Sequence, residues 1–256
     1  MNYAYVTVLS TNSYYKGVVA LFESLKETNP KYNKFVVIVN ETIDNDIVED
    51  LKRREYIVIV KPKIDASSLV KNTSYAYWVN TFDKLYVFEL TQFDKIVYLD
   101  SDMYIAKNID DLFDMPHMSG AISGKERVPD WDGINSGLMV IVPEEGILDK
   151  MKNILLTHEF NKDIGDQDII NEYFDWKNKN LAISEKYNLF YYVVDQYVNE
   201  FGYDSNDLRV IHYIGRHKPW MFDTQEIIGY RAKCQLEKKS LELKFFDKYM
   251  DIIDKI

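Results

Sequence analysis

Cysteine is nearly absent from this sequence, with Cys234 the single one in 256 residues. One cysteine excludes both an internal disulfide framework and a cluster of thiolate metal ligands, and it suits a reducing cytoplasm. No run of eighteen apolar residues occurs, so we expect no membrane span. The first residues, MNYAYVTVLSTN, enter a strand pattern directly and lack the features of a signal peptide. We therefore expect a cytoplasmic protein.

Positive charge and phosphate-binding glycine loops are also scarce. Acidic residues outnumber basic ones by 41 to 31, which gives a formal net charge of -10. Such a surface repels nucleic acid, so we expect no nucleic-acid partner. The sequence contains no P-loop, GxGxxG, GxSxG or HExxH motif. The sequence therefore lacks the motifs for P-loop phosphoryl transfer, dinucleotide redox chemistry, serine hydrolysis and zinc peptidase chemistry.

Strand patterns alternate with helical spacing through the first hundred residues. We expect strands at 3–10, 35–40, 56–60 and 95–99, and helices at 14–28, from 44 onward and at 77–90. The runs 35–40 and 56–60 are continuously apolar, which is typical of strands covered on both faces. This alternation predicts an α/β fold with a mostly parallel sheet and helices on both faces. Ligands bind such sheets at the carboxyl ends of the strands.

The second half of the chain is less regular. We expect strands at 121–124, 136–142 and 209–213, and helices at about 144–157 and 166–174. Residues 224–256 alternate charge with apolar positions, which predicts an amphipathic helical tail. That tail would either pack on the body or serve as a surface for homodimer formation. We accordingly divide the chain into a domain over 1–221 and a tail over 222–256.

The stretch VYLDSD sets two carboxylates at the end of an apolar strand. Asp-x-Asp occurs four times in the sequence, but only Asp100 and Asp102 follow a buried strand. Uncompensated charge is costly there, and a divalent cation would offset that cost. Oxygen ligands of this kind suit Mg²⁺ or Mn²⁺. The alternative is that both aspartates cap the turn into the segment NIDDLF.

A second polar group lies in the stretch HYIGRHKPW at 212–220. His212 can supply the nitrogen ligand of a manganese site otherwise built from carboxylates. Gly215 would let the backbone approach a phosphate, and Lys218 would neutralise a leaving diphosphate. The alternative is a core histidine followed by a surface lysine.

Taken together, the motifs TVLSTNSYYKG, TFDKL, YLDSDM, NIDDLFD, INSGLMV, GDQDIIN and HYIGRHKPW occur in an order that resembles a known family. Over residues 3–221 the sequence is similar to the retaining glycosyltransferases of family 8, and within them to the glycogenin group. The resemblance implies a GT-A fold, a UDP-sugar donor and Mn²⁺ as cofactor, with Mg²⁺ as the other candidate cation.

The resemblance also implies roles for individual residues. The metal ligands would be Asp100, Asp102 and His212, with Ser101 between the two carboxylates at the donor. A uridine-binding turn would comprise Leu9, Thr11, Asn12 and one tyrosine. Either Tyr14 or Tyr15 matches that tyrosine, and we expect Tyr15, because Lys16-Gly17 follows it. Gly215 and Lys218 match the contacts to the diphosphate.

The transferred sugar would lie among the remaining matched residues, namely Lys84, Asp132, Asn135, Asp163, Asp166 and Gln167. Of these, we expect Asp166, Gln167, Asp163 and Lys84 to take part in catalysis. An alternative reading of Gly165-Asp166-Gln167 is the start of a helix, with the aspartate as its cap.

These residues predict a Mn²⁺-dependent retaining enzyme that transfers a hexose, with glucose expected, from a UDP-sugar to a protein tyrosine or a glycan. A UDP-galactose donor and a nucleotide-sugar-binding module without activity remain open as alternatives. The position that matches the self-glucosylated tyrosine of the resembled group falls on Asp195, and Tyr191, Tyr192 and Tyr197 are out of register with it. We therefore expect the acceptor to be another molecule.

Overall fold

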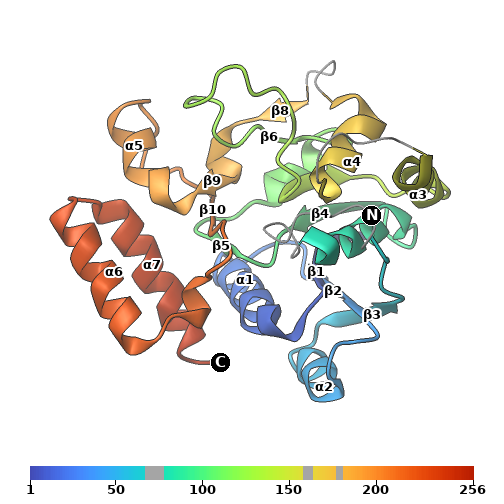
Figure 1. The fold of residues 1–256 in the computed structure, drawn as a ribbon, viewed down its shortest axis with the longest axis horizontal. Coiled ribbons are helices and arrows are strands. Elements are labelled where there is room, and N and C mark those ends of the chain that lie inside the picture. Colours follow the sequence, from blue (N-terminus) through green and yellow to red (C-terminus); the bar gives the residue numbers. More distant parts are fainter. Residues whose placement is uncertain (67–77, 158–163, 177–180) are drawn as a thin grey trace.

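A seven-stranded sheet forms the centre of the protein (Figure 1) in a computed structural model that describes residues 1–66, 78–157, 164–176 and 181–256. The strand order is β3-β2-β1-β4-β7-β6-β8. The strands are β1 (Tyr3–Leu9), β2 (Phe35–Asn40), β3 (Ile57–Lys61), β4 (Lys95–Leu99), β6 (Gly120–Ala121), β7 (Leu138–Ile141) and β8 (Ala182–Ile183). β1 to β4 are parallel, β7 runs antiparallel to β4 and β6, and β8 is parallel to β6. The predicted α/β fold with a mostly parallel sheet is confirmed.

The chain changes direction across the sheet at β1. It adds β2 and then β3 on one side, and returns to place β4 on the other side of β1. In open α/β sheets, the crevice outside the carboxyl ends of the two strands at such a switch point binds ligands. Ser10 and Asp100 directly follow β1 and β4, so both lie at this crevice.

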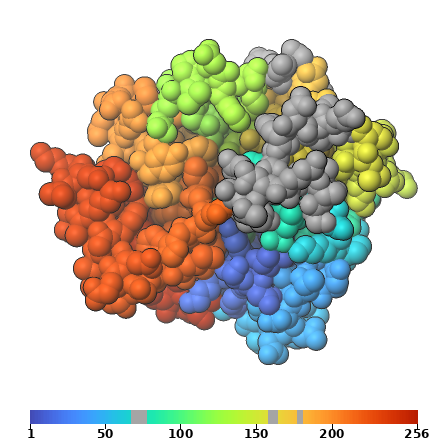
Figure 2. Space-filling model, viewed as in Figure 1, coloured from blue at the N-terminus to red at the C-terminus, as the bar shows by residue number. Residues whose placement is uncertain are grey.

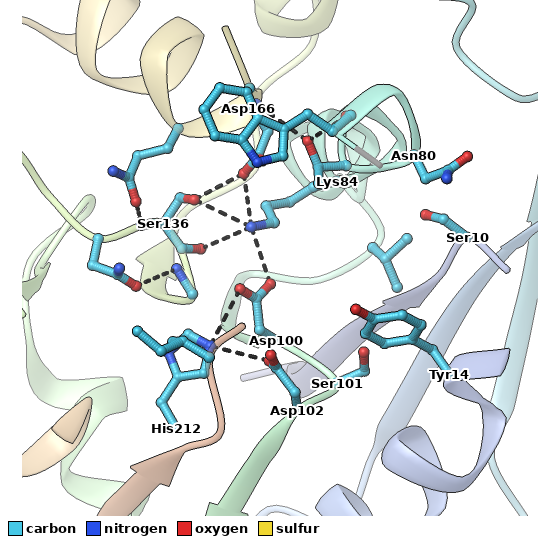
Figure 3. A pocket seen from close by; sticks show the side chains of 18 of the residues that line it. Ser10, Tyr14, Asn80, Lys84, Asp100, Ser101, Asp102, Ser136, Asp166 and His212 are labelled. Atoms are coloured by element: carbon cyan, nitrogen blue, oxygen red, sulfur yellow. Dashed lines mark hydrogen bonds and ion pairs between the residues drawn. The ribbon is translucent and has the colours of Figure 1, made fainter. Parts of the chain in front are cut away.

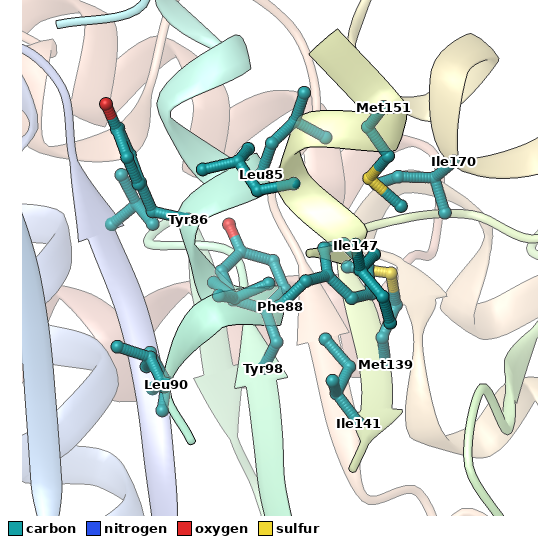
Figure 4. Packing of buried hydrophobic residues seen from close by; sticks show 14 of the residues in the cluster. Leu85, Tyr86, Phe88, Leu90, Tyr98, Met139, Ile141, Ile147, Met151 and Ile170 are labelled. Atoms are coloured by element: carbon teal, nitrogen blue, oxygen red, sulfur yellow. The ribbon is translucent and has the colours of Figure 1, made fainter. Parts of the chain in front are cut away.

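The two faces of the sheet carry separate hydrophobic clusters, because successive strand residues point to opposite sides. In β1, Ala4, Val6 and Val8 join one cluster, while Tyr5 and Leu9 join the other. The Val6 face packs under the 3-10 helix η4 (Phe82–Glu89) and the helices α3 (Ile147–Thr157) and α4 (Asp166–Phe174), as Figure 4 shows. The opposite face packs on α1 (Tyr15–Glu27) and α2 (Asn45–Arg53). Each fully buried aliphatic or aromatic side chain there contributes about 1.5–3 kcal/mol.

A second, three-stranded sheet brings a distant segment to the carboxyl end of β4. Its strands are β5 (Met103–Ile105), β10 (Val210–His212) and β9 (Leu189–Phe190), in the order β5-β10-β9. β10 runs antiparallel to β5, with His212 paired to Met103. Asp102 directly precedes Met103, so this register alone places His212 beside the second aspartate.

The C-terminal segment forms two helices, α6 (Thr224–Leu236) and α7 (Ser240–Ile253). α7 packs against α1 and α5 (Val194–Asn199), and Phe245 and Tyr249 are buried in one cluster with Tyr104 and Tyr213. Figure 2 shows this C-terminal segment as the red and orange flank of the molecule. Of the two alternatives for the tail, packing on the body or a surface for a homodimer, α7 therefore follows the first. α6 leaves its Leu236 side chain 85% exposed.

Several expected elements differ from the observed ones. The helix expected at 77–90 is the 3-10 helix η4, and residue 77 lies outside the described residues. The strand expected to be buried at 56–60 lies at the edge of the sheet, where Ile57 and Val60 are 41% and 61% exposed. The strand expected at 121–124 is only the two-residue β6, and the single expected tail is two helices. Nothing in the sequence pattern distinguishes an apolar edge strand from a central one.

Short 3-10 helices join the main elements. They are η1 (Asn12–Tyr14), η5 (Asp110–Asp114), η7 (Glu185–Tyr187), η8 (Tyr191–Val193) and η9 (Pro219–Met221). Among the described residues, the helices are all too short or too polar to cross a lipid bilayer.

Candidate active site

A pocket of about 500 Å³ opens at the carboxyl ends of β1 and β4, at the switch point of the sheet. Figure 3 shows its side chains converging from strand ends, from η4, from the start of α4 and from the end of β10. Eleven of the predicted site residues line it, namely Thr11, Lys84, Asp100, Ser101, Asp102, Asn135, Asp166, Gln167, His212, Gly215 and Lys218. Segments far apart in sequence thus meet where the fold predicts a ligand.

The two aspartates and the histidine form a compact group. His212 Nε2 lies 3.0 Å from Asp102 Oδ1 and 3.9 Å from Asp100 Oδ2. One potential ligand atom from each residue can be chosen so that all three lie within 4.8 Å of one another. The structure thereby brings together the three residues expected to hold a cation.

Each aspartate directs its other oxygen to a lysine. Lys84 Nζ lies 3.0 Å from Asp100 Oδ1, which also accepts a hydrogen bond of 2.6 Å from the Tyr98 hydroxyl. Lys218 Nζ donates to Asp102 Oδ2. The oxygens on the opposite sides, Asp100 Oδ2 and Asp102 Oδ1, are those that approach His212. Two carboxylate oxygens and one imidazole nitrogen form a donor set that fits Mn²⁺ or Mg²⁺.

Asp102 and Lys84 remain ionised although they are buried. Burial by itself would raise the pKa of Asp102, but the charge of Lys218 and its hydrogen bond lower it well below its usual value. Burial would lower the pKa of Lys84, and the carboxylates of Asp100 and Asp166 outweigh it and raise that pKa above its usual value. Alternating charges therefore stabilise one another inside the pocket.

Asp166 belongs to this charge network and does not cap its own helix. Its Oδ2 lies 2.7 Å from Lys84 Nζ and accepts a 2.8 Å hydrogen bond from the Ser136 hydroxyl. The N-cap of α4 is Gly165, whose backbone N–H donates to Asp168 at 3.0 Å. Gln167 Oε1 accepts from the backbone N–H of Ser136 at 3.1 Å. The helix start thus presents Asp166 and Gln167 to the pocket, and Asp168 closes the cap.

Of the two candidate tyrosines, the structure places Tyr14 at the pocket, whereas we had expected Tyr15. Tyr14 lines the pocket, with its ring 5.6 Å from Lys218 Nζ and edge-on to Trp220. Tyr15 begins α1, and its hydroxyl donates to Asp50 of α2 on the outer side. Successive helical residues diverge by about 100° around the axis, so two adjacent tyrosines cannot both face the same pocket.

Glycine permits α1 to approach the acidic turn closely. A Cβ on Gly17 would lie 2.6 Å from the backbone oxygen of Ser101. The absence of a side chain at Gly17 therefore allows the helix to reach the turn that carries Asp100 and Asp102.

Other expected residues do not reach the pocket with their side chains. Leu9 is fully buried in the core beneath α1. Asn12 Oδ1 accepts from the backbone N–H of Asp44 at 3.1 Å, and Asp132 is exposed outside the lining. Asp163 lies outside the described residues. Further lining residues, to which the sequence analysis gave no role of their own, are Val8, Ser10, Trp78, Asn80, Thr81, Tyr98, Trp131, Ser136, Gly137, Gly165, Asp168 and Ile214. All of them except Trp78, Asn80 and Trp131 lie within the quoted motifs, so the motif itself was the available signal.

Comparison with known proteins identifies relatives of this chain. It is 29% identical to glycogenin-1 of Mus musculus over 233 residues, which cover 86% of this chain and 66% of the relative. It is 32% identical to putative UDP-glucuronate:xylan alpha-glucuronosyltransferase 5 of Arabidopsis thaliana over 220 residues, covering 85% of this chain and 36% of that protein. The chain therefore spans between a third and two thirds of the length of these relatives.

The fold has a counterpart among solved structures. A crystal structure of the galactosyltransferase LgtC, in complex with donor and acceptor sugar analogs, superposes with a TM-score of 0.68 at 16% identity. The match covers 100% of this chain and 96% of that one. At this identity the likeness establishes the fold, which is of the GT-A type. The model of the family described as "Glycosyl transferase family 8" matches residues 5–224. Since that match includes all but the first four residues and the C-terminal helices, the chain belongs to glycosyltransferase family 8.

Proposed function

We propose that the chain transfers a hexose from a UDP-sugar to a separate acceptor, with retention of the anomeric configuration. The donor we favour is UDP-glucose, and the cation is Mn²⁺, with Mg²⁺ as the second choice. The observation that carries the proposal is the convergence of Asp100, Asp102 and His212 at one point of a pocket that also holds Lys218. A location in the cytoplasm, which the single cysteine supports, belongs to the same proposal.

The lining suggests how a donor would lie. The uracil would stack against Tyr14 near Thr11. The diphosphate would bind between Lys218 and the acidic group, by which we mean Asp100, Asp102 and His212. The sugar would then reach Asn135, Asp166 and Gln167 on the far side of the pocket. This orientation uses one continuous cavity and places the leaving group next to the positive charges.

Two features favour departure of the diphosphate. A divalent cation bound by the acidic group would act as a Lewis acid that offsets the negative charge of the leaving group. An ammonium group has three N–H donors, so Lys218 can keep its bonds to Asp102 and to the Tyr213 carbonyl and still bind a phosphate oxygen. Gly215 has a φ of +102°, a conformation that suits glycine, and it shapes the loop that carries Lys218 to the site.

The sugar side of the pocket is prepared for a positively charged transition state. Cleavage of a glycosidic bond passes through an oxocarbenium-like state, which a nearby carboxylate stabilises. Burial tends to raise the pKa of Asp166, but Lys84 and the hydrogen bonds of Ser136 and Thr81 lower it. Asp166 therefore stays ionised in a buried position, where its charge is screened little by water.

The environment of the residues near 195 supports an acceptor other than the chain itself. Asp195 accepts hydrogen bonds from the backbone N–H groups of Leu241 and Glu242 at 3.0 and 2.9 Å, so it caps α7. Tyr197 is fully buried and donates to Glu185 at 2.7 Å. Neither side chain is available to receive a sugar.

Calorimetric titration with UDP, with and without Mn²⁺, tests the proposal. We expect a clear heat of binding that requires Mn²⁺ and is lost in Asp102→Asn, while the circular dichroism of the variant stays unchanged. A panel of UDP-sugars with Mn²⁺ then identifies the donor from the release of UDP or free sugar. Equal weak heats with and without the cation, together with no turnover of any UDP-sugar, would refute it.

A further inference from the structure

A chain of buried amide groups holds the ring of His212. His212 Nδ1 lies 2.8 Å from Asn188 Oδ1, and Asn188 Nδ2 donates to Asn135 Oδ1 at 2.8 Å. The backbone N–H of Gly137 donates to the same Asn135 oxygen at 3.1 Å. Asn188 is fully buried and His212 is 4% exposed, so water does not compete for these bonds.

The direction of every bond in this chain follows from Gly137. A backbone N–H can only donate, so the atom of Asn135 that it contacts is the oxygen. That oxygen must receive its second bond from the NH₂ group of Asn188, which turns the Asn188 oxygen toward His212. An amide oxygen can only accept, so Nδ1 of His212 carries a proton.

We infer that Asn188 is a positioning residue that fixes His212 in its Nδ1–H form and presents the lone pair of Nε2 to a divalent cation. The inference rests on the proposed function for the identity of that cation. Nε2 then faces Asp102 Oδ1 at 3.0 Å and Asp100 Oδ2 at 3.9 Å. Three electron-pair donors that face one another repel, and a cation between them removes the repulsion.

The alternative ring state shows what Asn188 prevents. With the proton on Nε2, His212 would donate to Asp102 Oδ1 at the existing distance of 3.0 Å. That bond would satisfy both groups and would occupy the lone pairs that a cation needs. Without Asn188, the Nε2–H form is therefore the more stable one, and a cation would have to displace its proton.

The surrounding backbone keeps Asn188 in place. The Ser123 hydroxyl donates to the Asn188 carbonyl at 2.7 Å, and the residues after Asn188 form β9, which pairs with β10 so that Phe190 lies opposite His212. The amide therefore directly precedes β9, and the imidazole belongs to the last residue of the neighbouring strand β10. Partners of metal-binding histidines of this kind typically change metal affinity by 10- to 100-fold when mutated.

The first test is Mn²⁺ binding, followed by the electron paramagnetic resonance signal of free Mn²⁺. Asn188→Leu keeps the number and branching of the side-chain heavy atoms and removes both hydrogen bonds, so we expect affinity about 10- to 100-fold weaker than in the unmodified protein. Asn188→Asp retains an acceptor for the Nδ1 proton and should bind Mn²⁺ more tightly than Asn188→Leu. Asn108→Leu is the matched control, because Asn108 makes comparable amide bonds at Thr28 and Asp110, outside the pocket.

The second test needs no metal. Nitrogen-15 chemical shifts of the imidazole rings distinguish the two proton positions, and His212→Gln identifies the signal of His212 among the four histidines. The spectra are recorded at high pH, where the ring is neutral and its signals no longer change with pH. There we expect an Nδ1–H ring in the unmodified protein and an Nε2–H ring in Asn188→Leu. Thermal melts of all variants establish that each is folded.

The outcomes separate this inference from the proposed function. Unchanged Mn²⁺ affinity and an unchanged ring form in folded Asn188→Leu would overturn the role of Asn188, as would an Nε2–H ring in the unmodified protein. If the unmodified protein bound no Mn²⁺ but the ring changed as expected, the metal-dependent function would fail while the positioning role of Asn188 would stand.

Discussion

The ammonium of Lys84 lies 2.7 Å from the Asp166 carboxylate, deep in the pocket, where both side chains are 8% exposed. Lys84 comes from η4 and Asp166 from the first position of α4, so one ion pair joins two elements of the same face of the sheet. Lys84 also contacts Asp100 at 3.0 Å, which links both elements to the acidic turn after β4.

Removing this ammonium should destabilise the fold. Lys84→Met leaves two carboxylates without their counter-charge, and breaking a buried pair in this way costs about 3–5 kcal/mol. Lys95→Met is the matched control, because Lys95 Nζ donates to the backbone carbonyls of Phe113 and Met115 and leaves no charge behind. Unfolding in urea measures the free energy of unfolding of both variants. A smaller decrease of that free energy in Lys84→Met than in Lys95→Met would contradict the charge argument.

A methyl group on Gly137 should disturb the cation site. A Cβ there would lie 2.7 Å from His212 Cε1, 2.9 Å from Asn135 Oδ1 and 3.0 Å from Asp100 Oδ2. We expect Gly137→Ala to weaken Mn²⁺ binding at least tenfold. Gly229→Ala in α6 is the control, since nothing lies within 4 Å of a Cβ there, and it should leave binding unchanged and raise stability by about 0.5–1 kcal/mol. Wild-type Mn²⁺ affinity in folded Gly137→Ala would count against this geometry.

The two adjacent tyrosines should separate binding from stability. Tyr14→Leu removes the ring at the pocket, and since stacking on a base is worth about 1–3 kcal/mol, UDP affinity should fall about tenfold or more. Tyr15→Leu breaks the bond to Asp50 and should lower the melting temperature without changing UDP affinity in the folded protein. Calorimetry and thermal melts report the two effects. The reverse pattern would restore Tyr15 as the residue at the uracil.

Intact mass should show no attached sugar. After incubation with UDP-glucose and Mn²⁺, we expect the mass of the chain to stay unchanged, because Asp195 is engaged at α7 and Tyr197 is buried. Tyr192, at 37% exposure, is the most accessible tyrosine of that segment. A mass increase that disappears in Tyr192→Phe would show that the chain is its own acceptor.

The single thiol should be unreactive in the folded protein. Burial raises the pKa of Cys234 to about 11, with a further contribution from Glu242. This value exceeds the pKa of a thiol in the unfolded chain. The contribution of the protonated thiol to the free energy of unfolding is therefore fully present below the unfolded pKa, and it is lost as the pH rises toward 11. A thiol reagent at pH 8 should therefore react slowly, and rapidly after unfolding in urea. Rapid reaction of the native protein would show that Cys234 is accessible.

The sequence predicted the main sheet well because its signals are local. The runs 35–40 and 95–99 are apolar apart from Asn40 and Lys95, and the structure has them as β2 and β4. The position of Asp100 at a strand end also followed, since a polar pair after such a run marks where the strand leaves the sheet. The link to His212 came from the family resemblance, because the register of β10 on β5 joins residues more than a hundred positions apart.

The remaining features depend on contacts that one-dimensional spacing does not encode. Whether Tyr14 or Tyr15 faces the pocket depends on the residue at which α1 begins. Asn188 carried no motif of its own, and it becomes informative only through the direction of the bonds around it. The exposure of β3 reflects its place at the sheet edge, which the order of strands decides.

The cap that Asp195 provides also constrains how this chain can evolve. Tyrosine at this position would have no carboxylate for the two N–H groups at the start of α7, and losing such a cap costs about 0.5–2 kcal/mol. A descendant with an acceptor tyrosine here would first have to anchor its last helix by other means. Self-modification and a docked C-terminal helix are thus competing uses of one residue position.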